Sequence, residues 1–219
     1  MTVPSIKEGV VRALKVHFFD VINVVPPKER IYSRLGFVKG KTRVAEAQKT
    51  RIEQDILRSL ELINMRGAAV RCPILEKTDY LFKIHGGLTF SGKSLLQMLE
   101  GAEEVLFMAS TAGREIVSAI SAAIGAADMT GAVVFDAVAS EMTDEGLDWI
   151  MEYYSYELRR ENKSLTKRRF SAGYGDFSLE NQKNIGDVLE LEKIGVRVTP
   201  YFLLEPEKSV TAVAGICPI

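Results

Sequence analysis

The sequence predicts an α+β fold, in which helices pack on a mainly antiparallel sheet. Two pairs of short β-prone runs each flank a polar turn, and several segments between them have helical periodicity. The regular alternation of strands and helices that builds a parallel sheet is missing. With 219 residues, 47% of them hydrophobic, the chain can fill one compact core. We expect residues 1–85 to form a helical and hairpin segment that packs with a main core of residues 86–219.

The N-terminal part begins without a clear pattern. The first forty residues mix apolar runs with prolines and glycines, which is typical of an irregular segment. Residues 42–65 then have the pattern of a helix with one apolar stripe, formed by Ile52, Ile56, Leu60 and Ile63. Gly67 is expected to end this helix.

The next segments predict short strands and helices. Two β-prone runs, residues 72–75 and 80–85, flank a polar four-residue turn and predict a hairpin. Residues 93–100 fit a short helix and residues 105–109 a buried strand. Residues 111–127 are rich in small side chains, which indicates closely packed helices.

The C-terminal half is expected to contain the longest helix. Its apolar stripe extends over residues 131–161, and Gly146 is the point where a break is expected. A second helix is expected over residues 178–194, capped by Ser178 and closed by Gly195.

A second hairpin is predicted at the end of the sequence. Residues 196–204 and 210–216 are β-prone runs on either side of the turn 205–209. Together with the first hairpin, this pair supports an antiparallel sheet.

The chain has few of the cysteines and histidines that form thiolate and imidazole metal sites. The two cysteines, Cys72 and Cys217, are far apart and form no CxxC pair, and the two histidines are His17 and His85. This pattern argues against a thiolate zinc site, a disulfide framework and a histidine-rich metal centre. The Asp-x-His-x-x-Gly loop with which many corrinoid carriers ligate cobalamin is also missing. We therefore expect no cobalamin on this chain itself.

Charge and hydropathy argue against two classes of partner. With 28 basic and 29 acidic residues, the net charge of −1 gives no overall attraction to nucleic acid or to an anionic membrane. The most continuous apolar run, residues 116–127, is shorter than the roughly 20 residues that a membrane span requires. Residues 1–10 lack the basic and apolar regions of a signal peptide. We expect a soluble, cytoplasmic protein.

Residues 87–94 match the phosphate-loop pattern G-x-x-x-x-G-K-[ST] between an expected strand and an expected helix. In a nucleotide hydrolase, Lys93 would contact the phosphates, Ser94 would hold magnesium and Asp136 would supply a second carboxylate. Chance alone produces such a match in on the order of 1% of chains of this length.

The surroundings of this match argue against a phosphate loop. The strand before such a loop is buried on both faces, whereas the run before residue 87 contains Lys83 and His85. Asp136 also has the spacing of a helical residue. A P-loop nucleotide hydrolase is therefore an alternative and not the leading hypothesis.

A second motif, Arg-x-x-x-Gly-Tyr, spans residues 169–174. Arg169 can hold a ligand carboxylate through two parallel charge-assisted hydrogen bonds. Ala172 and Gly173 lack bulk, so the backbone can approach a ligand closely, and Tyr174 offers a ring face or a hydroxyl. Taken singly, each residue also has a default role, because a basic run is usually a solvated face and a tyrosine beside a turn is usually half-buried.

With this motif the sequence resembles the activation domain of cobalamin-dependent methionine synthase, in a self-standing form. The resemblance continues downstream in residues 203–210 with Gly215 and Ile216 and, upstream, in residues 106–113 and 136–141. It covers about residues 90–219 and is strongest over residues 165–219.

The resemblance implies an accessory module that binds S-adenosylmethionine. Such a module supports the reductive remethylation of cobalamin on a separate methionine synthase or related corrinoid protein, with a flavodoxin-like protein as the expected reductant. The implied ligand-binding residues are Glu141, Arg169, Phe170, Ala172, Gly173 and Tyr174. No turnover is expected from the chain alone. Because the family continues beyond the position of Ile219 with an aromatic ligand contact, a docking module without S-adenosylmethionine binding is a second alternative.

Overall fold

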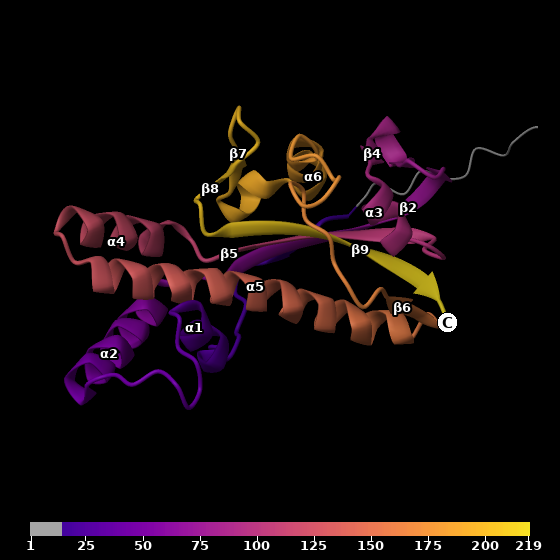
Figure 1. Ribbon diagram of the computed structural model, residues 1–219. Coiled ribbons are helices and arrows are strands. Elements are labelled where there is room, and N and C mark those ends of the chain that lie inside the picture. Colours follow the sequence, from indigo (N-terminus) through magenta and orange to yellow (C-terminus); the bar gives the residue numbers. More distant parts are fainter. Residues whose placement is uncertain (1–14) are drawn as a thin grey trace, which may run out of the picture.

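A seven-stranded antiparallel sheet forms the centre of the computed structural model, which describes residues 15–219 (Figure 1). The strand order is β4-β3-β2-β5-β9-β6, and β1 pairs with β2 as well. The predicted α+β class with a mainly antiparallel sheet is confirmed. The strands are β1 His17–Phe19, β2 Arg66–Lys77, β3 Leu81–Ile84, β4 Thr89–Ser91, β5 Glu104–Thr111, β6 Lys163–Leu165 and β9 Ser209–Pro218.

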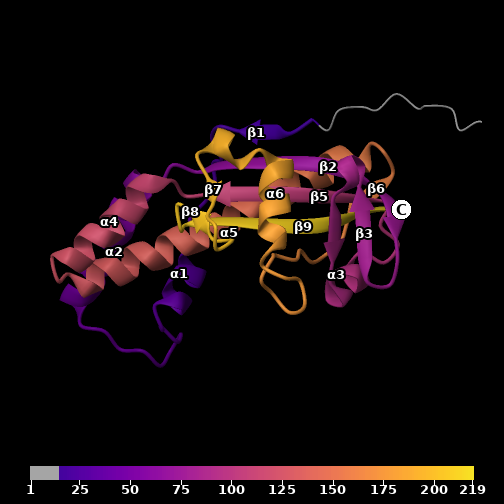
Figure 2. The same cartoon turned by 90° about the horizontal axis from the view of Figure 1, so that it is seen from above.

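Helices cover both faces of this sheet. Helix α5 runs along one face, with α1 and α2 packed against it, while α6 and α3 lie on the opposite face (Figure 1). Seen from above, α6 lies over the central strands (Figure 2). The helices are α1 Lys28–Arg34, α2 Glu46–Leu62, α3 Lys93–Met98, α4 Arg114–Gly125, α5 Met129–Arg159 and α6 Asn181–Leu189.

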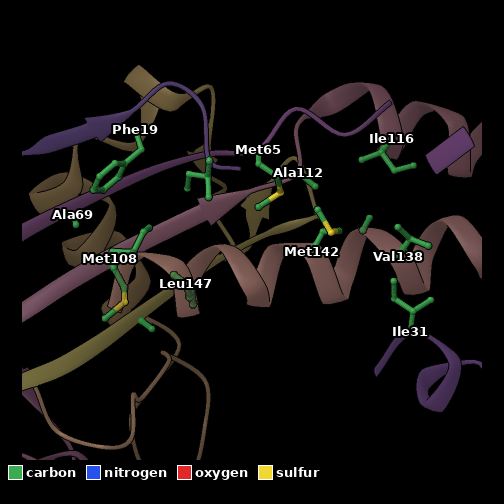
Figure 3. Packing of buried hydrophobic residues seen from close by; sticks show 14 of the residues in the cluster. Phe19, Ile31, Met65, Ala69, Met108, Ala112, Ile116, Val138, Met142 and Leu147 are labelled. Atoms are coloured by element: carbon green, nitrogen blue, oxygen red, sulfur yellow. The ribbon is translucent and has the colours of Figure 1, made fainter. Parts of the chain in front are cut away.

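The central strands explain why two helical layers are needed. Residues 67–70 of β2, 105–111 of β5 and 211–216 of β9 are buried on both faces of the sheet. On the α5 face, Met108 and Ala69 lie near Leu147, and Ile31 of α1 lies beside Val138 (Figure 3). Burial of these apolar side chains is the main stabilising contribution to this layer.

The long helix is confirmed and continues without a break through Gly146. A Cβ atom at Gly146 would lie 2.2 Å from Ser110 Oγ and 2.7 Å from Met65 Cε. The glycine therefore allows α5 to approach the sheet closely, and no break occurs there. Asp128 caps the start of α5 by accepting a hydrogen bond of 3.0 Å from the Gly131 N–H.

Two expectations for the N-terminal part are wrong. The segment expected to be irregular contains β1 and α1 among its described residues. The helix that follows ends at Leu62, because the backbone of Ile63 is already extended. Gly67 lies inside β2, where a Cβ atom would be 2.8 Å from both Ala109 O and Ile22 Cδ1. Close packing, and not helix termination, requires this glycine.

The first predicted hairpin is confirmed, because β2 and β3 pair antiparallel across a short turn. The predicted helices near residues 93–100 and 178–194 are present but shorter. Ser178 does not cap a helix, since α6 begins at Asn181 and the Ser178 hydroxyl only accepts from Glu180 N–H at 3.3 Å. A separate 3₁₀ turn, Leu191–Ile194, follows α6 and is closed by Gly195.

The second predicted hairpin is wrong. Strands β7 (Arg197–Val198) and β8 (Leu204–Glu205) pair with each other, whereas β9 pairs with β5 and β6. The reason is burial, because residues 211–216 of β9 are buried on both faces and therefore need a helical layer above and below, which a position beside β5 provides.

No helix within residues 15–219 is both long enough and apolar enough to span a membrane. Residues 1–10, considered above for a signal peptide, lie outside the described residues.

Candidate functional site

The outer edge of β9 is paired along only part of its length. Strand β6 pairs with its end, and Phe170 exchanges two backbone hydrogen bonds of 2.9 and 2.8 Å with Val213. Beyond Phe170 the chain leaves the edge. Outward-facing peptide groups alternate along an antiparallel strand, so those of Thr211 are the next to face outward. No strand within residues 15–219 pairs with them on this side.

The Arg-x-x-x-Gly-Tyr motif forms a tight loop at the point where the chain leaves β9. Gly173 N–H donates to Phe177 O at 2.8 Å, and Phe177 N–H donates to Tyr174 O at 3.0 Å. Gly173 has a φ of +90° and a Cβ atom there would lie 3.1 Å from Leu179 Cδ1, so both backbone conformation and space favour glycine.

A cleft of about 350 Å³ lies between this loop and the segment that leads into β9. We call it the β9 cleft. Its volume is at the lower end of the range of small-molecule sites. Its lining comes from Ser171, Ala172 and Tyr174 of the loop, from Leu179 and Gln182, and from residues 202–204, 207 and 209–211.

The polar groups of the β9 cleft are few. Glu207 is the one carboxylate among its lining residues. Gln182 and Thr211 are buried, and the Gln182 amide contacts the Thr211 hydroxyl at 2.9 and 3.0 Å. Tyr174 is 70% exposed, so its ring is accessible from solvent at the cleft. This combination of apolar walls with a carboxylate, an amide and an accessible ring suits a small organic cation.

Arg169 and Phe170 point to opposite faces of the sheet, as neighbours in extended backbone do. Phe170 packs on the α6 face, with its ring 6.3 Å from that of Phe177. Arg169 instead reaches α5, where it forms ion pairs with Asp148 and, at 3.7 Å, with Asp144. Its side chain is 23% exposed.

Glu141 also lies on the α5 side of the sheet. Its carboxylate accepts from Arg30 Nε at 2.9 Å and from Arg34 Nε at 2.6 Å, and its side chain is 11% exposed. Arg30 contacts Asp148 as well, at 3.3 Å. A chain of ion pairs thus connects Glu141 through Arg30 and Asp148 to Arg169.

The six predicted site residues therefore form two groups. Ala172 and Tyr174 line the β9 cleft, with Gly173 between them and Phe170 packed beside them. Arg169 and Glu141 belong to the charged row on α5. The sequence did not predict Gln182, Glu207 or Thr211 as site residues, although Glu207 lies within residues 203–210, which carried part of the resemblance, and Thr211 follows them.

The phosphate-loop match is divided between the two faces of the sheet. Residues 87–94 span an edge strand and the start of α3, where Ser94 N–H donates to both oxygens of Asp176 at 3.2 Å. Lys93 is exposed. Asp136 lies on α5, across the sheet, and is paired with Lys208 at 2.6 Å. These residues do not form a magnesium–phosphate site.

Two other features of residues 15–219 add no residue to the candidate site. A larger cleft of about 830 Å³ lies on the other side of Phe202, lined by α6 and by charged residues of both signs. It contains none of the predicted site residues. Within this part of the chain no group of three or more His, Cys, Asp or Glu side chains could hold a metal ion.

A comparison with solved structures finds the same fold in a protein described as the "MetH Reactivation Domain bound to AdoHcy". The superposition has a TM-score of 0.66, covers 92% of this chain and 78% of the other, and has 16% sequence identity. No family model matches the sequence, and no curated protein matches it. The chain thus has the fold of that reactivation domain, and the similarity extends well beyond residues 90–219.

Proposed function

We propose that this chain binds S-adenosylmethionine in the β9 cleft and acts as an accessory module in the remethylation of cobalamin on a separate protein. The observation that supports this most directly is the position of the cleft. It lies at the open edge of β9, is lined by the Arg-x-x-x-Gly-Tyr loop, and occurs in a fold that a solved relative uses while bound to AdoHcy.

The β9 cleft offers groups for each part of the proposed ligand. The Glu207 carboxylate can favour the positive charge of the sulfonium or of the amino group. The outward peptide groups of Thr211 can hydrogen-bond polar atoms of the ligand. Tyr174 can stack on the base, an interaction worth about 1–3 kcal/mol in nucleic-acid complexes.

Arg169 is proposed to hold the ligand's α-carboxylate. To do so, its guanidinium must exchange Asp148 for the ligand. Because the guanidinium points to the α5 side, it must turn around the open edge of β9 to reach the cleft. Asp148 would keep its contact of 3.3 Å with Arg30, whereas Asp144, which Arg169 contacts at 3.7 Å, would be left to solvent. Glu141 holds Arg30 and therefore acts as a positioning residue at the other end of this row.

The methyl acceptor in this proposal is cobalamin on a methionine synthase or another corrinoid protein. There, one electron from a low-potential donor such as a flavodoxin reduces cob(II)alamin to cob(I)alamin, whose electron pair takes the sulfonium methyl and leaves S-adenosylhomocysteine. The chain's own part is to bind the methyl donor and to present its methyl group. No turnover is expected without the corrinoid partner.

Calorimetric titration provides the first test, with S-adenosylmethionine, S-adenosylhomocysteine and Mg-ATP in parallel. We expect saturable binding of the first two and none of Mg-ATP. The second test mixes the protein with a cobalamin-loaded methionine synthase that lacks its activation domain, plus a low-potential reductant. The optical spectrum should then change from cob(II)alamin to methylcobalamin only when S-adenosylmethionine is present.

The two tests also separate the alternatives. Binding without conversion of cob(II)alamin would contradict the reactivation role but not the ligand site. A complex with the corrinoid protein in the absence of S-adenosylmethionine binding would favour a docking module.

A further inference from the structure

Phe202 has a backbone conformation that a bulky side chain rarely adopts. Its φ is +62°, in the left-handed region that favours glycine. It closes the turn between β7 and β8, where Phe202 N–H donates to Thr199 O at 2.9 Å and Thr199 N–H donates to Leu203 O at 2.8 Å. Short hairpin loops of this kind usually have glycine at the left-handed position. The chain therefore keeps a phenylalanine where the backbone is strained.

The hydrophobic core does not account for this strain. Phe202 is half-buried, yet within residues 15–219 it belongs to neither cluster of buried apolar side chains and is not packed against one. Of the turn residues 199–203, it alone lines both the β9 cleft and the larger cleft beside α6. Its neighbours Tyr201 and Leu203 are 80% and 57% exposed. Strained residues cluster at ligand-binding sites, so the position of this ring points to a ligand contact.

Phe202 and Arg169 mark opposite ends of the open edge of β9. The β7–β8 hairpin lies beside the start of this strand (Figure 2), whereas Arg169 adjoins Phe170, which pairs with Val213 further along it. A ligand whose carboxylate is held by Arg169 therefore has its other end, the base, toward Phe202. Aromatic rings stack readily on the flat faces of bases. Tyr174, on the loop across the cleft, leaves one face of the base for a second ring.

We propose that Phe202 is a ligand-contact residue whose ring stacks on the base of S-adenosylmethionine at the end of the β9 cleft nearest the β7–β8 hairpin. The left-handed backbone of Phe202 places the ring at the wall between the two clefts, and the contact with the base explains why glycine does not occupy this position. The inference rests on the proposed function, because it assigns one part of the same ligand to one end of the same cleft. A purely structural wall between the clefts would need apolar volume but not an aromatic ring.

The test measures the dissociation constant of S-adenosylhomocysteine by calorimetry. Phe202→Leu keeps an apolar side chain but removes the aromatic faces, and it should raise the constant about fivefold or more, the lower end of the usual worth of a base stacked on a ring. Phe202→Tyr keeps the ring and should stay within about threefold of the wild type. The matched control is Tyr201→Leu, which changes the neighbouring exposed ring outside both clefts and should have no effect.

A second pair of variants separates the strain from the contact. Glycine adopts a positive φ without steric cost, so Phe202→Gly should unfold at a higher urea concentration than Phe202→Ala. Both should bind S-adenosylhomocysteine more weakly than the wild type, because both lack the ring. Should Phe202→Leu fail to fold, Phe202→Gly provides the same comparison of affinity.

Three results would overturn the inference while leaving the proposed function intact. Wild-type affinity in Phe202→Leu would show that the ring does not contact the base. Equal losses of affinity in Phe202→Leu and Phe202→Tyr would indicate a structural requirement and not a ring contact. A Phe202→Gly variant no more stable than Phe202→Ala would remove the strain on which the inference depends. A wild-type chain that binds neither S-adenosylmethionine nor S-adenosylhomocysteine would overturn the proposed function as well.

Discussion

The two halves of the outer edge of β9 differ in what satisfies their backbone groups. Along the closed half, residues 213–218, β6 and Phe170 pair with the strand, and Thr166 contributes hydrogen bonds of 2.9 and 3.0 Å to Gly215. Along the open half, residues 209–212, the chain has left the edge and the β9 cleft takes its place. An open strand edge is usually a liability, so its position beside the β9 cleft supports the proposed ligand site.

We therefore expect the closed half to contribute to the stability of the fold and the open half to contribute to ligand binding. The two roles can be separated because, apart from Phe170, the residues involved do not overlap. Substitutions in the closed half should change the unfolding free energy, whereas those around the open half should change ligand affinity.

The largest effect is expected for Gly215→Ala in the closed half. A Cβ atom there would lie 2.9 Å from Thr166 Cγ2 and 3.0 Å from both Ala102 Cβ and Leu99 Cδ2. Because Leu99 and Ala102 are buried and cannot move freely, we expect a loss of about 3 kcal/mol, at the upper end of the range for overpacking. Urea denaturation measures this loss. The matched control is Ser164→Ala, at an exposed position of β6. Gly101→Ala is unsuitable as a glycine control, because a φ of +76° favours glycine there.

Arg169→Ala tests the proposed binding role of the region around the open half. Loss of a charge-assisted bond to the ligand carboxylate should weaken S-adenosylmethionine binding by about 1.5–3 kcal/mol. Arg168→Ala, at the exposed neighbouring position, should have little effect. An Arg169→Ala dissociation constant equal to that of the wild type would mean that another group holds the carboxylate.

The stability of the folded state near the closed half should also fall in acid. Burial disfavours ionisation of Glu104, but hydrogen bonds from Arg71, at 3.0 and 3.1 Å, and from Lys163 outweigh this and hold its pKa below the ordinary value of 4.5. A lowered pKa in the folded state means that the stabilisation is complete above the pKa of the unfolded chain and is lost as the pH falls through the folded value.

Thermal unfolding of the wild type and Glu104→Gln as a function of pH measures this contribution. The wild type should be the more stable at pH 7, and the difference should narrow below about pH 4.5. The size of the effect should be moderate because the network is partly open to solvent. A difference that stays constant down to pH 2.5 would show that Glu104 does not titrate with folding.

The smallest effect is expected for Lys93→Ala. Lys93 is exposed on the α3 side of the sheet, so both the free energy of unfolding and the free energy of ligand binding should change by less than about 0.5 kcal/mol. Saturable binding of Mg-ATP that this substitution abolishes would reinstate the nucleotide hydrolase.

The local sequence pattern was sufficient to predict single elements and strands that pair with their neighbour in the sequence. The long apolar stripe predicted α5 nearly to its ends, and the polar turn predicted the β2–β3 hairpin. Pattern was not sufficient for the choice of strand partner. The turn at residues 205–209 looks like a hairpin loop, yet β9 pairs with β5 because its two buried faces must lie between the two helical layers.

The site was predictable only where its residues are adjacent in the sequence. Ala172, Gly173 and Tyr174 form a motif and lie together at the cleft. Gln182 and Thr211 have no local signal, because a glutamine in a helix and a threonine in a strand are ordinary. They meet only because α6 crosses over β9, which no short pattern contains.

The position of β9 has a consequence for how the chain folds. This strand follows every other strand in the sequence, yet it lies between β5 and β6 in the sheet. During synthesis the sheet therefore cannot be completed before residues 209–218 have been made, and the edge of β5 stays uncovered until then. Its apolar residues, such as Leu106 and Phe107, would be accessible to other chains in that interval. Pairing partners so distant in sequence also favour slow folding, so refolding yield should fall steeply as protein concentration rises.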